Sequence, residues 1–404
     1  MTRFLLLLMM IISFSDSAFS QKKVIAQART YIKSGKDLEK AEKLMADLLK
    51  KDSANRLNEK IWLTYFDAVK KQYEQGNEKL YLKQKYDTTA LFNITKKMFI
   101  VLQGLDTLDA MPDKKGVVHL KYRARHAEYL ASHRPNIYNG GTFHTRKGDY
   151  QKAFTFFDMY LDADSQPIFT GYDFLTNDTL MPTAAYWATY CGYRMKNDSL
   201  TLKYAGLAEK DTARLEYIYQ YEAETYKARN DTAAYVSTLR KGFYRYPKSL
   251  FFFPRLIDYY NDENMVDSVS TTVDYALAID STSQLFRFAE STLLLNTGNY
   301  DECIRICQEL IAEDDSLADA HYNIGVAYFN QAIELDKVTQ RARQKRRKIQ
   351  EFYEKARPYI ERYRALAPDE KEKWVPVLYT IYLNLNMGKE FDEIDRVRMK
   401  MNRK

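Results

Sequence analysis

Cysteine, proline and glycine are all scarce in this sequence. Its 404 residues include 3 Cys, 9 Pro and 14 Gly, against 33 Tyr and 21 Phe. The low cysteine count excludes a small disulfide-stapled scaffold, and the low Gly and Pro content excludes a collagen-like chain. A hydrophobic fraction of 46% is enough to fill a core and excludes intrinsic disorder. The composition therefore predicts a mostly helical chain, packed through aromatic side chains and longer than one compact domain.

A strong excess of one charge sign is also missing. The chain has 61 Lys and Arg against 54 Asp and Glu, a formal net charge of +7. The two signs are mixed along most of the sequence, whereas nucleic-acid-binding proteins gather positive charge on one surface. We therefore expect no nucleic-acid partner.

Long apolar runs are absent after residue 20, and the run before it is short. Residues 1–20 contain Arg3, an eleven-residue apolar stretch at Phe4–Phe14, and the small-x-small sequence Ala18–Ser20. Eleven helical residues rise about 16 Å, too little to cross a hydrocarbon layer of about 30 Å. We predict a signal peptide that is removed before Gln21, with an uncleaved anchor as the alternative. The mature chain is then exported to the periplasm or cell envelope without a transmembrane segment.

Sequence signatures of catalysis are missing as well. The sequence has no His-Glu-x-x-His, no Gly-x-Ser-x-Gly, no phosphate-binding loop and no dinucleotide-binding glycine pattern. His119, His126 and His133 are spaced seven apart, so helical geometry would separate neighbours by about 10.5 Å, too far to share a metal ion. With Arg123 and Arg134 beside them, we interpret these histidines as a solvated basic stripe on one helix. We expect no catalytic residues, no metal site and no cofactor.

The three cysteines are expected to be small core residues. Cys303 and Cys307 are four residues apart in an apolar helical run, and Cys191 is distant in sequence. An exported protein invites disulfide pairing, but two cysteines four apart on one helix have poor geometry for it. Burial in the core is therefore the preferred interpretation.

Turn signals return at a nearly fixed interval. Asn230, Asn264 and Gly298 are separated by 34 residues each, and Asn197 precedes Asn230 by 33. Asn or Gly can end a helix in the left-handed conformation, and a following Asp, Ser or Thr can cap the next helix. This period predicts repeated helix–turn–helix units.

The side chains repeat in the same register. We place unit starts near residues 134, 183, 216, 250, 284 and 318. At the eleventh position of these units stand His144, Tyr193, Tyr226, Tyr260, Leu294 and Tyr328. The eighth position, where a small residue would allow close helix crossing, holds Gly141, Tyr190, Ala223, Ile257, Ser291 and Gly325.

In these features the chain resembles the tetratricopeptide repeat family. Ile324, Gly325 and Tyr328 match the family's Leu-Gly-x-x-Tyr pattern, and the stretches 148–157 and 35–41 match its second-helix pattern. The resemblance implies an all-α fold, a right-handed superhelical solenoid of antiparallel helix pairs. Such an array stacks its pairs around a continuous core and leaves a concave groove lined by the first helices.

The predicted domain organisation follows from the period. After the signal peptide, residues 21–133 hold one repeat and longer helices, including the ranges 61–75 and 88–103. The repeat array spans 134–369, and C-terminal capping helices span 370–404. Within the last unit, an insertion near 332–352 lacks Gly and Pro, so we expect it to lengthen both helices of that unit into a protruding hairpin.

The resemblance also implies which side chains line the groove. Carried over position by position, the candidate partner-binding residues are Tyr138, Asn139, Arg146, Trp187, Arg194, Tyr217, Gln220, Tyr221, Glu224, Lys227, Arg255, Asp258, Asn261, Tyr322 and Asn323. This polar and aromatic mixture suits an extended peptide held through its backbone and a few rings. The alternative is that many of these rings only seal the junctions between helices.

The insertion carries a run of positive charge without acidic residues. It forms a possible docking surface through Arg341, Arg343, Lys345, Arg346, Arg347 and Lys348. Interleaved stacking aromatics, which single-stranded nucleic acid would require, are lacking here. A solvated helix extension and docking on an acidic partner, anionic lipid or glycan both stay open.

Taken together, the sequence favours a non-catalytic, exported scaffold that binds a protein or peptide in the groove. One alternative is a glycan-binding protein of the cell envelope that uses the groove aromatics. Another is an assembly factor for envelope complexes.

Overall fold

The structure is a computed structural model that describes residues 21–337 and 343–401. Within these ranges the regular secondary structure is helical, as the composition and the period predicted. The chain divides into two compact units, Met1–Thr238 and Leu239–Lys404, called unit 1 and unit 2 below.

Two predictions concern residues outside this description. The signal peptide at 1–20 and the docking residue Arg341 both fall on residues that the structure does not describe. Among the helices that it does describe, none is both long enough and apolar enough to cross a bilayer.

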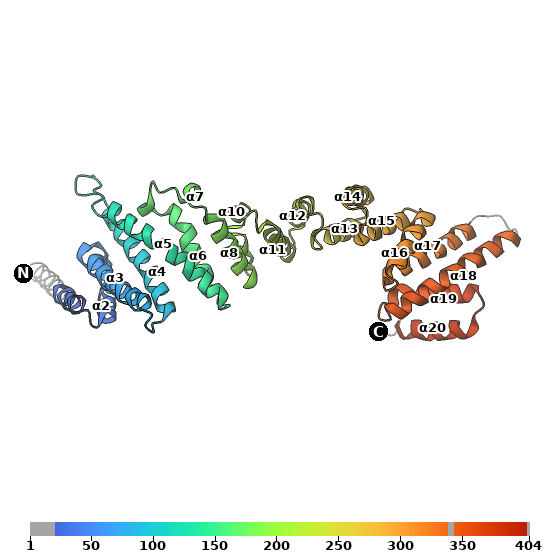
Figure 1. Ribbon diagram of the computed structural model, residues 1–404, viewed down its shortest axis with the longest axis horizontal. Helices are drawn as coiled ribbons and strands as arrows, with labels where there is room; N and C mark the ends of the chain where they lie inside the picture. The colour runs from blue at the N-terminus through green and yellow to red at the C-terminus, as the bar shows by residue number, and fades with distance from the viewer. Residues whose placement is uncertain (1–20, 338–342, 402–404) are drawn as a thin grey trace, which may run out of the picture. The chain divides into compact units, whose positions relative to one another are not determined.

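Unit 1 is a succession of helices, most of which contact the next in the chain. A helix over residues 21–34 comes first. It is followed by α2 (Leu38–Lys51), η1 (Ser53–Leu57), α3 (Glu59–Tyr81), α4 (Thr88–Asp109), α5 (Arg123–Arg146), α6 (Tyr150–Asp162), η2 (Ala163–Ser165), η3 (Pro167–Phe169), α7 (Phe174–Asn177), α8 (Met181–Arg194), α9 (Asp198–Leu202), α10 (Ala205–Ala208) and α11 (Leu215–Ala228). Contacts within the pairs α3–α4, α5–α6 and α8–α9 alternate with contacts that join α4 to α5 and α6 to α8 (Figure 1).

Unit 2 continues in the same manner. Helix α12 (Thr232–Arg245) crosses the boundary between the units. It is followed by α13 (Phe252–Asp262), α14 (Val266–Ile279), α15 (Gln284–Asn296), α16 (Tyr300–Glu313), α17 (Ala318–Lys337), α18 (Arg343–Leu366), α19 (Lys371–Asn384) and α20 (Gly388–Met401). Successive helices run antiparallel, and each of α13 to α19 contacts its successor. The all-α architecture of sequential helix pairs is therefore as predicted.

The turns between helices explain the period in the sequence. Asn230, Asn264 and Gly298 adopt positive φ angles of 56°, 55° and 83°, a conformation that Asn and Gly tolerate better than other residues. At each turn the following amide bonds to the carbonyl five residues earlier in the chain, which belongs to Tyr226, Tyr260 and Leu294 respectively. This is the backbone closure of a Schellman cap, and it recurs every 34 residues because the acceptors are themselves 34 apart.

The turn predicted at Asn197 differs from the other turns in which residue adopts the positive φ angle. Lys196 takes the positive φ of 53°, not Asn197. The side chain of Asn197 instead accepts a hydrogen bond from the amide of Leu200 at 3.1 Å and caps α9.

The close helix crossing in this hairpin also lies elsewhere than the register predicted. A Cβ on Gly192 would come within 2.4 Å of the Thr201 backbone nitrogen, so the backbones of α8 and α9 approach each other there. Tyr190, which the register placed at the crossing, is half-buried among other rings. A tyrosine side chain does not fit between two backbones at this distance. In contrast, Gly141 packs against the ring of Phe157, as its register position predicted.

The basic stripe predicted across residues 119–134 is wrong. His119 lies in the loop before α5 and not on the helix. His126 is only 3% exposed, and its ring stacks on that of Tyr122 at a centroid distance of 5.6 Å. Burial, with the nearby charge of Arg125, lowers the pKa of His126, so this histidine is a core residue and not a solvated cation.

Arg134, assigned to the same stripe, lies within the core of unit 1. It is 5% exposed, and its guanidinium lies 3.7 Å from the ring centroid of Tyr160 and 3.9 Å from that of Phe174. It forms an ion pair with Asp178 and donates a hydrogen bond to the carbonyl of Tyr160 at 3.0 Å. These partners come from α6 and the α7 region, so α5 is fastened to the segment that leads into α8.

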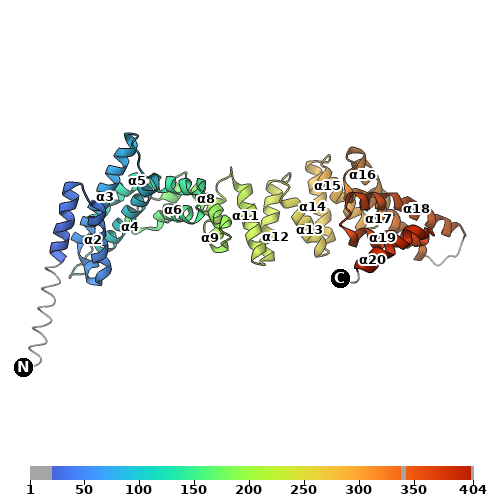
Figure 2. The ribbon, with the colours of Figure 1, turned by 90° about the horizontal axis from the view of Figure 1, so that it is seen from below.

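Residues 332–337 and 343–352 of the inserted stretch belong to two long helices. Helix α17 has 20 residues and α18 has 24, whereas α15 and α16 have 13 and 14. Figures 1 and 2 show α17 and α18 lying side by side and extending beyond the neighbouring helices of unit 2.

The prediction for the cysteines is confirmed. Cys191, Cys303 and Cys307 all lie within the described residues, where they are buried and unpaired. They fill the core as small apolar side chains.

Candidate functional site

A cluster of tyrosine, tryptophan and arginine side chains lies on α8 and α11 of unit 1. Trp187, Tyr190 and Arg194 follow one another at spacings of three and four on α8, and Tyr217 and Tyr221 are four apart on α11. Such spacings place side chains on one face of a helix. Because α8 and α11 contact each other, their two faces form one surface, which we call the aromatic face.

The rings of the aromatic face pack closely on one another. Tyr193 and Tyr221 stack with centroids 4.5 Å apart and planes 26° apart. Tyr190 lies 5.9 Å from Tyr221 and meets Trp187 nearly at right angles at 5.8 Å. Ring pairs at these separations attract one another beyond simple burial, so the surface is held in shape before any partner binds.

Arg194 is the exposed cation of this face. Its guanidinium lies 4.7 Å from the ring centroid of Tyr150, and it donates a hydrogen bond to the hydroxyl of Tyr190 at 2.6 Å. The guanidinium has five N–H donors, so most remain available to a carboxylate or a peptide carbonyl.

Arg214 is a second cation that packs against the rings of the aromatic face. It pairs with Asp211 at 2.8 Å and lies 5.3 Å from the ring centroid of Tyr186. Asp211 is 8% exposed and also accepts a hydrogen bond from Thr183 at 3.0 Å. A buried carboxylate thus fixes the guanidinium against the rings of α8.

The hydroxyl of Tyr221 stays protonated. Burial is the largest cause that raises its pKa, and the neighbouring tyrosines Tyr186, Tyr190 and Tyr193 raise the pKa further. Tyr221 therefore contributes a neutral hydroxyl to the aromatic face at physiological pH.

The fifteen predicted groove residues are divided between unit 1 and unit 2. Trp187, Arg194, Tyr217 and Tyr221 belong to the aromatic face, and Gln220, Glu224 and Lys227 lie on the same helix α11. On α5, Asn139 and Arg146 are exposed, whereas the half-buried ring of Tyr138 packs against Phe157 and Tyr160 at 5.7 and 5.6 Å.

The remaining predicted groove residues belong to unit 2. Arg255 bonds to the carbonyl of Phe251 at 3.0 Å, and Asp258 and Asn261 are exposed on the same helix. Tyr322 packs against Tyr363 at 4.9 Å. Asn323 is buried, which differs from the prediction, because its amide donates hydrogen bonds to Ser291 and Thr292 and ties α17 to α15.

Five residues of the aromatic face were missed by the sequence analysis, including Tyr193, which was assigned to the eleventh register position. Tyr150, Tyr186 and Arg214 do not stand at the groove positions implied by the family resemblance, and Tyr190 was assigned to a helix crossing. The spacing of Tyr190 and Arg194 by four residues was the available signal, since it predicts contact on a helix.

The predicted basic docking residues begin α18. Arg343, Arg346, Arg347 and Lys348 are exposed, whereas Lys345 is half-buried and donates to the carbonyl of Asp336 at 2.9 Å. These side chains make the start of α18 positively charged.

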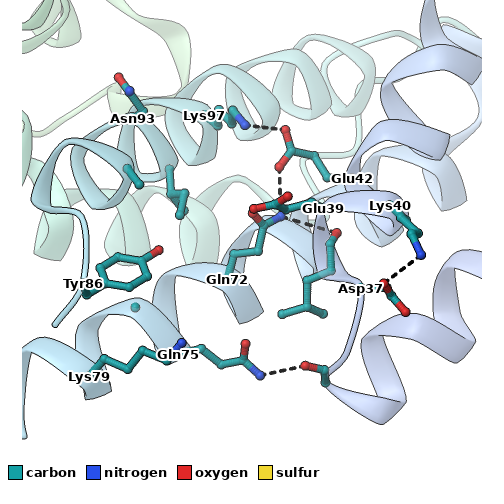
Figure 3. Close-up of a pocket in the computed structure, with 15 residues that line it drawn as sticks. Asp37, Glu39, Lys40, Glu42, Gln72, Gln75, Lys79, Tyr86, Asn93 and Lys97 are labelled. Atoms are coloured by element: carbon teal, nitrogen blue, oxygen red, sulfur yellow. Dashed lines mark hydrogen bonds and ion pairs between the residues drawn. The ribbon is translucent and has the colours of Figure 1, made fainter. Parts of the chain in front are cut away.

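A pocket of about 690 Å³ lies between α2, α3 and α4 (Figure 3). Glu42 points to Lys97 and to Gln72, with contacts of 2.5 and 2.9 Å. Gln75 donates to the carbonyl of Gly35 at 3.0 Å. The polar groups along this pocket bind one another and thereby join the three helices. In the part of the chain that the structure describes, no group of three or more His, Cys, Asp and Glu side chains could hold a metal ion.

Comparison with known proteins gives matches among solved structures only. No protein-family model matches the chain, and no curated protein matches it. The C-terminal part of a TPR repeat-containing protein from Cytophaga hutchinsonii is 10% identical, with 64% of this chain and 92% of that chain covered and a TM-score of 0.42. A TPR repeats protein from Bacteroides fragilis is 16% identical, with 65% and 98% covered and a TM-score of 0.29.

Yeast Tom70 is 10% identical, with 95% of this chain and 97% of that chain covered and a TM-score of 0.28. At these scores and identities the likeness carries no argument about function. The arrangement of this chain as sequential antiparallel helix pairs rests on its own contacts, and in that arrangement it is similar to these structures.

Proposed function

We propose that this chain is a non-catalytic tetratricopeptide-type scaffold that binds a protein or peptide segment on the aromatic face. The observation that carries this proposal is the packing of Arg194 against Tyr150 and Tyr190, beside the stacked pair Tyr193–Tyr221. Tyrosine and arginine are the residues that most often dominate binding energy at protein interfaces. The rings are already held in place, so little conformational entropy is lost when a partner binds.

The two proposed classes of partner would use this face in different ways. A peptide would bond to the tyrosine hydroxyls and to Arg194 through its backbone or a carboxylate. A glycan would stack a sugar ring on Trp187 or Tyr217. We favour the peptide, because the guanidinium of Arg194 matches a carboxylate or carbonyl more closely than it matches a neutral sugar.

The binding proposal predicts a site-specific cross-link. Tyr217 is 52% exposed on the aromatic face, and Tyr244 is 50% exposed in unit 2. A photo-reactive phenylalanine analogue at position 217 is expected to capture one defined protein in cells, whereas the same analogue at 244 captures none. Adding Arg194→Ala should reduce the product about tenfold, because it removes an anchor of the face. Product bands are identified by mass spectrometry.

Two results would contradict the binding proposal. Equal capture at positions 217 and 244 would mean that the reactive group reports exposure alone. Capture that does not respond to Arg194→Ala would exclude the aromatic face as the binding surface. Retardation in a polysaccharide gel that is lost with Trp187→Ala would support the glycan alternative in place of a peptide.

We also propose that residues 1–20 direct export to the periplasm or cell envelope. The expected mature N-terminus is Gln21, read by N-terminal sequencing of protein from the envelope fraction of a Gram-negative host. Ala18→Leu should block cleavage, since signal peptidase requires a small residue there, whereas Phe19→Leu should leave cleavage intact. Recovery of the chain with Met1 still attached would contradict the proposal.

We make a second, smaller proposal for the exposed basic side chains at the start of α18. Arg343, Arg346, Arg347 and Lys348 carry four positive charges over six residues, so we assign this end of the hairpin to an acidic partner surface. Electrostatic attraction of this kind speeds association and weakens with salt.

A further inference from the structure

The loop between α4 and α5 exposes an unusual group of apolar side chains. Every residue from Met111 to Lys121 is exposed. Met111, Val117 and Val118 are each 48% exposed and Leu120 is 45% exposed. Four large aliphatic side chains in eleven exposed residues mark a contact surface, since folded chains rarely gather them in solvent without a partner. Figure 1 shows this loop projecting beyond the ends of the two helices.

Internal hydrogen bonds fix the shape of the loop. The Asp113 carboxylate accepts the amides of Lys115 and Val117 at 2.7 and 3.0 Å. The Asp113 amide in turn donates to the carbonyl of Val117 at 2.8 Å, next to the bridge between Pro112 and Val118. Gly116 takes the positive φ of 81° that the tight turn requires. The apolar side chains are therefore presented on a preformed tip, and little backbone order has to be created on binding.

Lysines flank these apolar side chains in the sequence. The loop carries Lys114, Lys115 and Lys121 against the single acid Asp113. Lys121, at the base, pairs with Glu59 of α3 at 3.2 Å, and His119 lies 3.4 Å from Asp113. The two lysines at the turn are next to the valines, and their alkyl stems can lie along an apolar layer while the ammonium groups stay in water.

We propose that this loop is a membrane-contact site that inserts its aliphatic tip between anionic lipids. Aliphatic side chains with lysines beside them in the chain match the two layers of a bilayer surface, an apolar interior beneath negative headgroups. A protein partner is disfavoured because residues 111–121 contain no Trp, Tyr or Arg, the side chains on which protein interfaces depend most. The loop thus attaches unit 1 to a membrane surface without spanning it.

A fluorescent label at the tip tests this proposal. Val118→Cys in the full chain places the reactive thiol at the tip, because Cys191, Cys303 and Cys307 are buried. An environment-sensitive dye on this thiol is expected to shift to the blue with vesicles of phosphatidylcholine and phosphatidylglycerol in equal parts. No shift is expected with phosphatidylcholine alone. The label reports the tip itself, so the apolar run in residues 1–20 does not contribute to the signal.

Matched variants distinguish insertion of the loop into the bilayer from non-specific adsorption of the protein to vesicles. Leu250 in unit 2 is 78% exposed, and Leu250→Cys with the same dye should give no shift. Lys114→Glu combined with Lys115→Glu should weaken vesicle binding at the tip at least about tenfold, and raised salt should weaken it as well. Circular dichroism is expected to be unchanged, since the altered side chains are exposed.

Three outcomes would overturn the proposal. They are the absence of a shift at position 118, an equal shift at 118 and 250, and a shift that does not respond to the double charge reversal. Protection of residue 118 by a protein in a vesicle-free extract would instead assign the loop to a protein partner.

Discussion

Replacing Arg134 by Met is expected to lower the free energy of unfolding of unit 1 by about 3–5 kcal/mol. The substitution removes the guanidinium from a site that is 5% exposed. Asp178 then loses its ion pair and the Tyr160 carbonyl loses a donor. The Asp178 side chain is only 16% exposed, so water replaces the lost cation incompletely and the unpaired carboxylate is costly. Urea denaturation followed by hydrogen exchange over residues 163–181 measures the effect within unit 1.

Two variants serve as controls for this prediction. Lys152→Met removes an ion pair with Asp149 in which the lysine side chain is 59% exposed, and the expected loss is below about 1 kcal/mol. Adding Asp178→Asn to Arg134→Met should recover part of the loss, since no unpaired carboxylate is then left at this site. If Arg134→Met lowered the free energy of unfolding no more than Lys152→Met does, the Arg134–Asp178 network would contribute little to stability.

The same network predicts a dependence on pH. Burial raises the pKa of Asp178, but hydrogen bonds from Tyr160, Arg134 and the Leu180 amide outweigh it, and the pKa lies below its ordinary value of 3.8. A carboxyl group with a depressed pKa stabilises the folded state above its unfolded-state pKa, and this stabilisation is lost as the pH falls through the folded-state value. Unit 1 should therefore lose stability on acidification below about pH 4, and Arg134→Met should reduce this loss.

Replacing Gly192 by Ala is expected to lower the free energy of unfolding by about 1–3 kcal/mol. The added Cβ would lie 2.4 Å from the Thr201 nitrogen and 2.6 Å from the Leu200 carbonyl carbon. These are backbone atoms, so relief requires α8 and α9 to move apart. Because α8 carries Trp187 and Arg194, the cross-link from position 217 should weaken too.

Gly206→Ala is the matched control for this effect. A Cβ on Gly206, in helix α10, would meet no atom within 4 Å. The expected change is a gain of about 0.5–1 kcal/mol, since alanine restricts the unfolded chain. If the two alanine variants had equal stability, the α8–α9 crossing would not be as tight as the distances indicate.

The repeated helices were predictable because their causes are local. Asn230, Asn264 and Gly298 end helices through their own backbone preferences, and a preference of this kind can be read from the residue type alone. Trp187, Arg194, Tyr217 and Tyr221 of the aromatic face were predicted for a different reason, namely the resemblance to a repeat family. The match of each residue to a groove position came from the family resemblance.

The fate of individual polar residues was not predictable from local pattern. Arg134 was interpreted as solvated, yet its partner Asp178 lies 44 residues further along the chain. Asn323 was predicted to face a groove, yet it bonds to Ser291 and Thr292 of another helix. The helix crossing assigned to Tyr190 lies two residues further along, at Gly192. The sequence alone could not reveal this shift, since it depends on how closely the backbone of the neighbouring helix approaches.

By itself, the sequence determined where helices end, how often they return and that their packing is aromatic. Turn preference, apolar spacing and composition act over a few residues, so they are present in the chain before it folds. Only the tertiary structure decided which charges are buried, which rings meet on α8 and α11, and that residues 111–121 form a fixed tip. Those outcomes depend on atoms that are far apart in the sequence and adjacent only after packing.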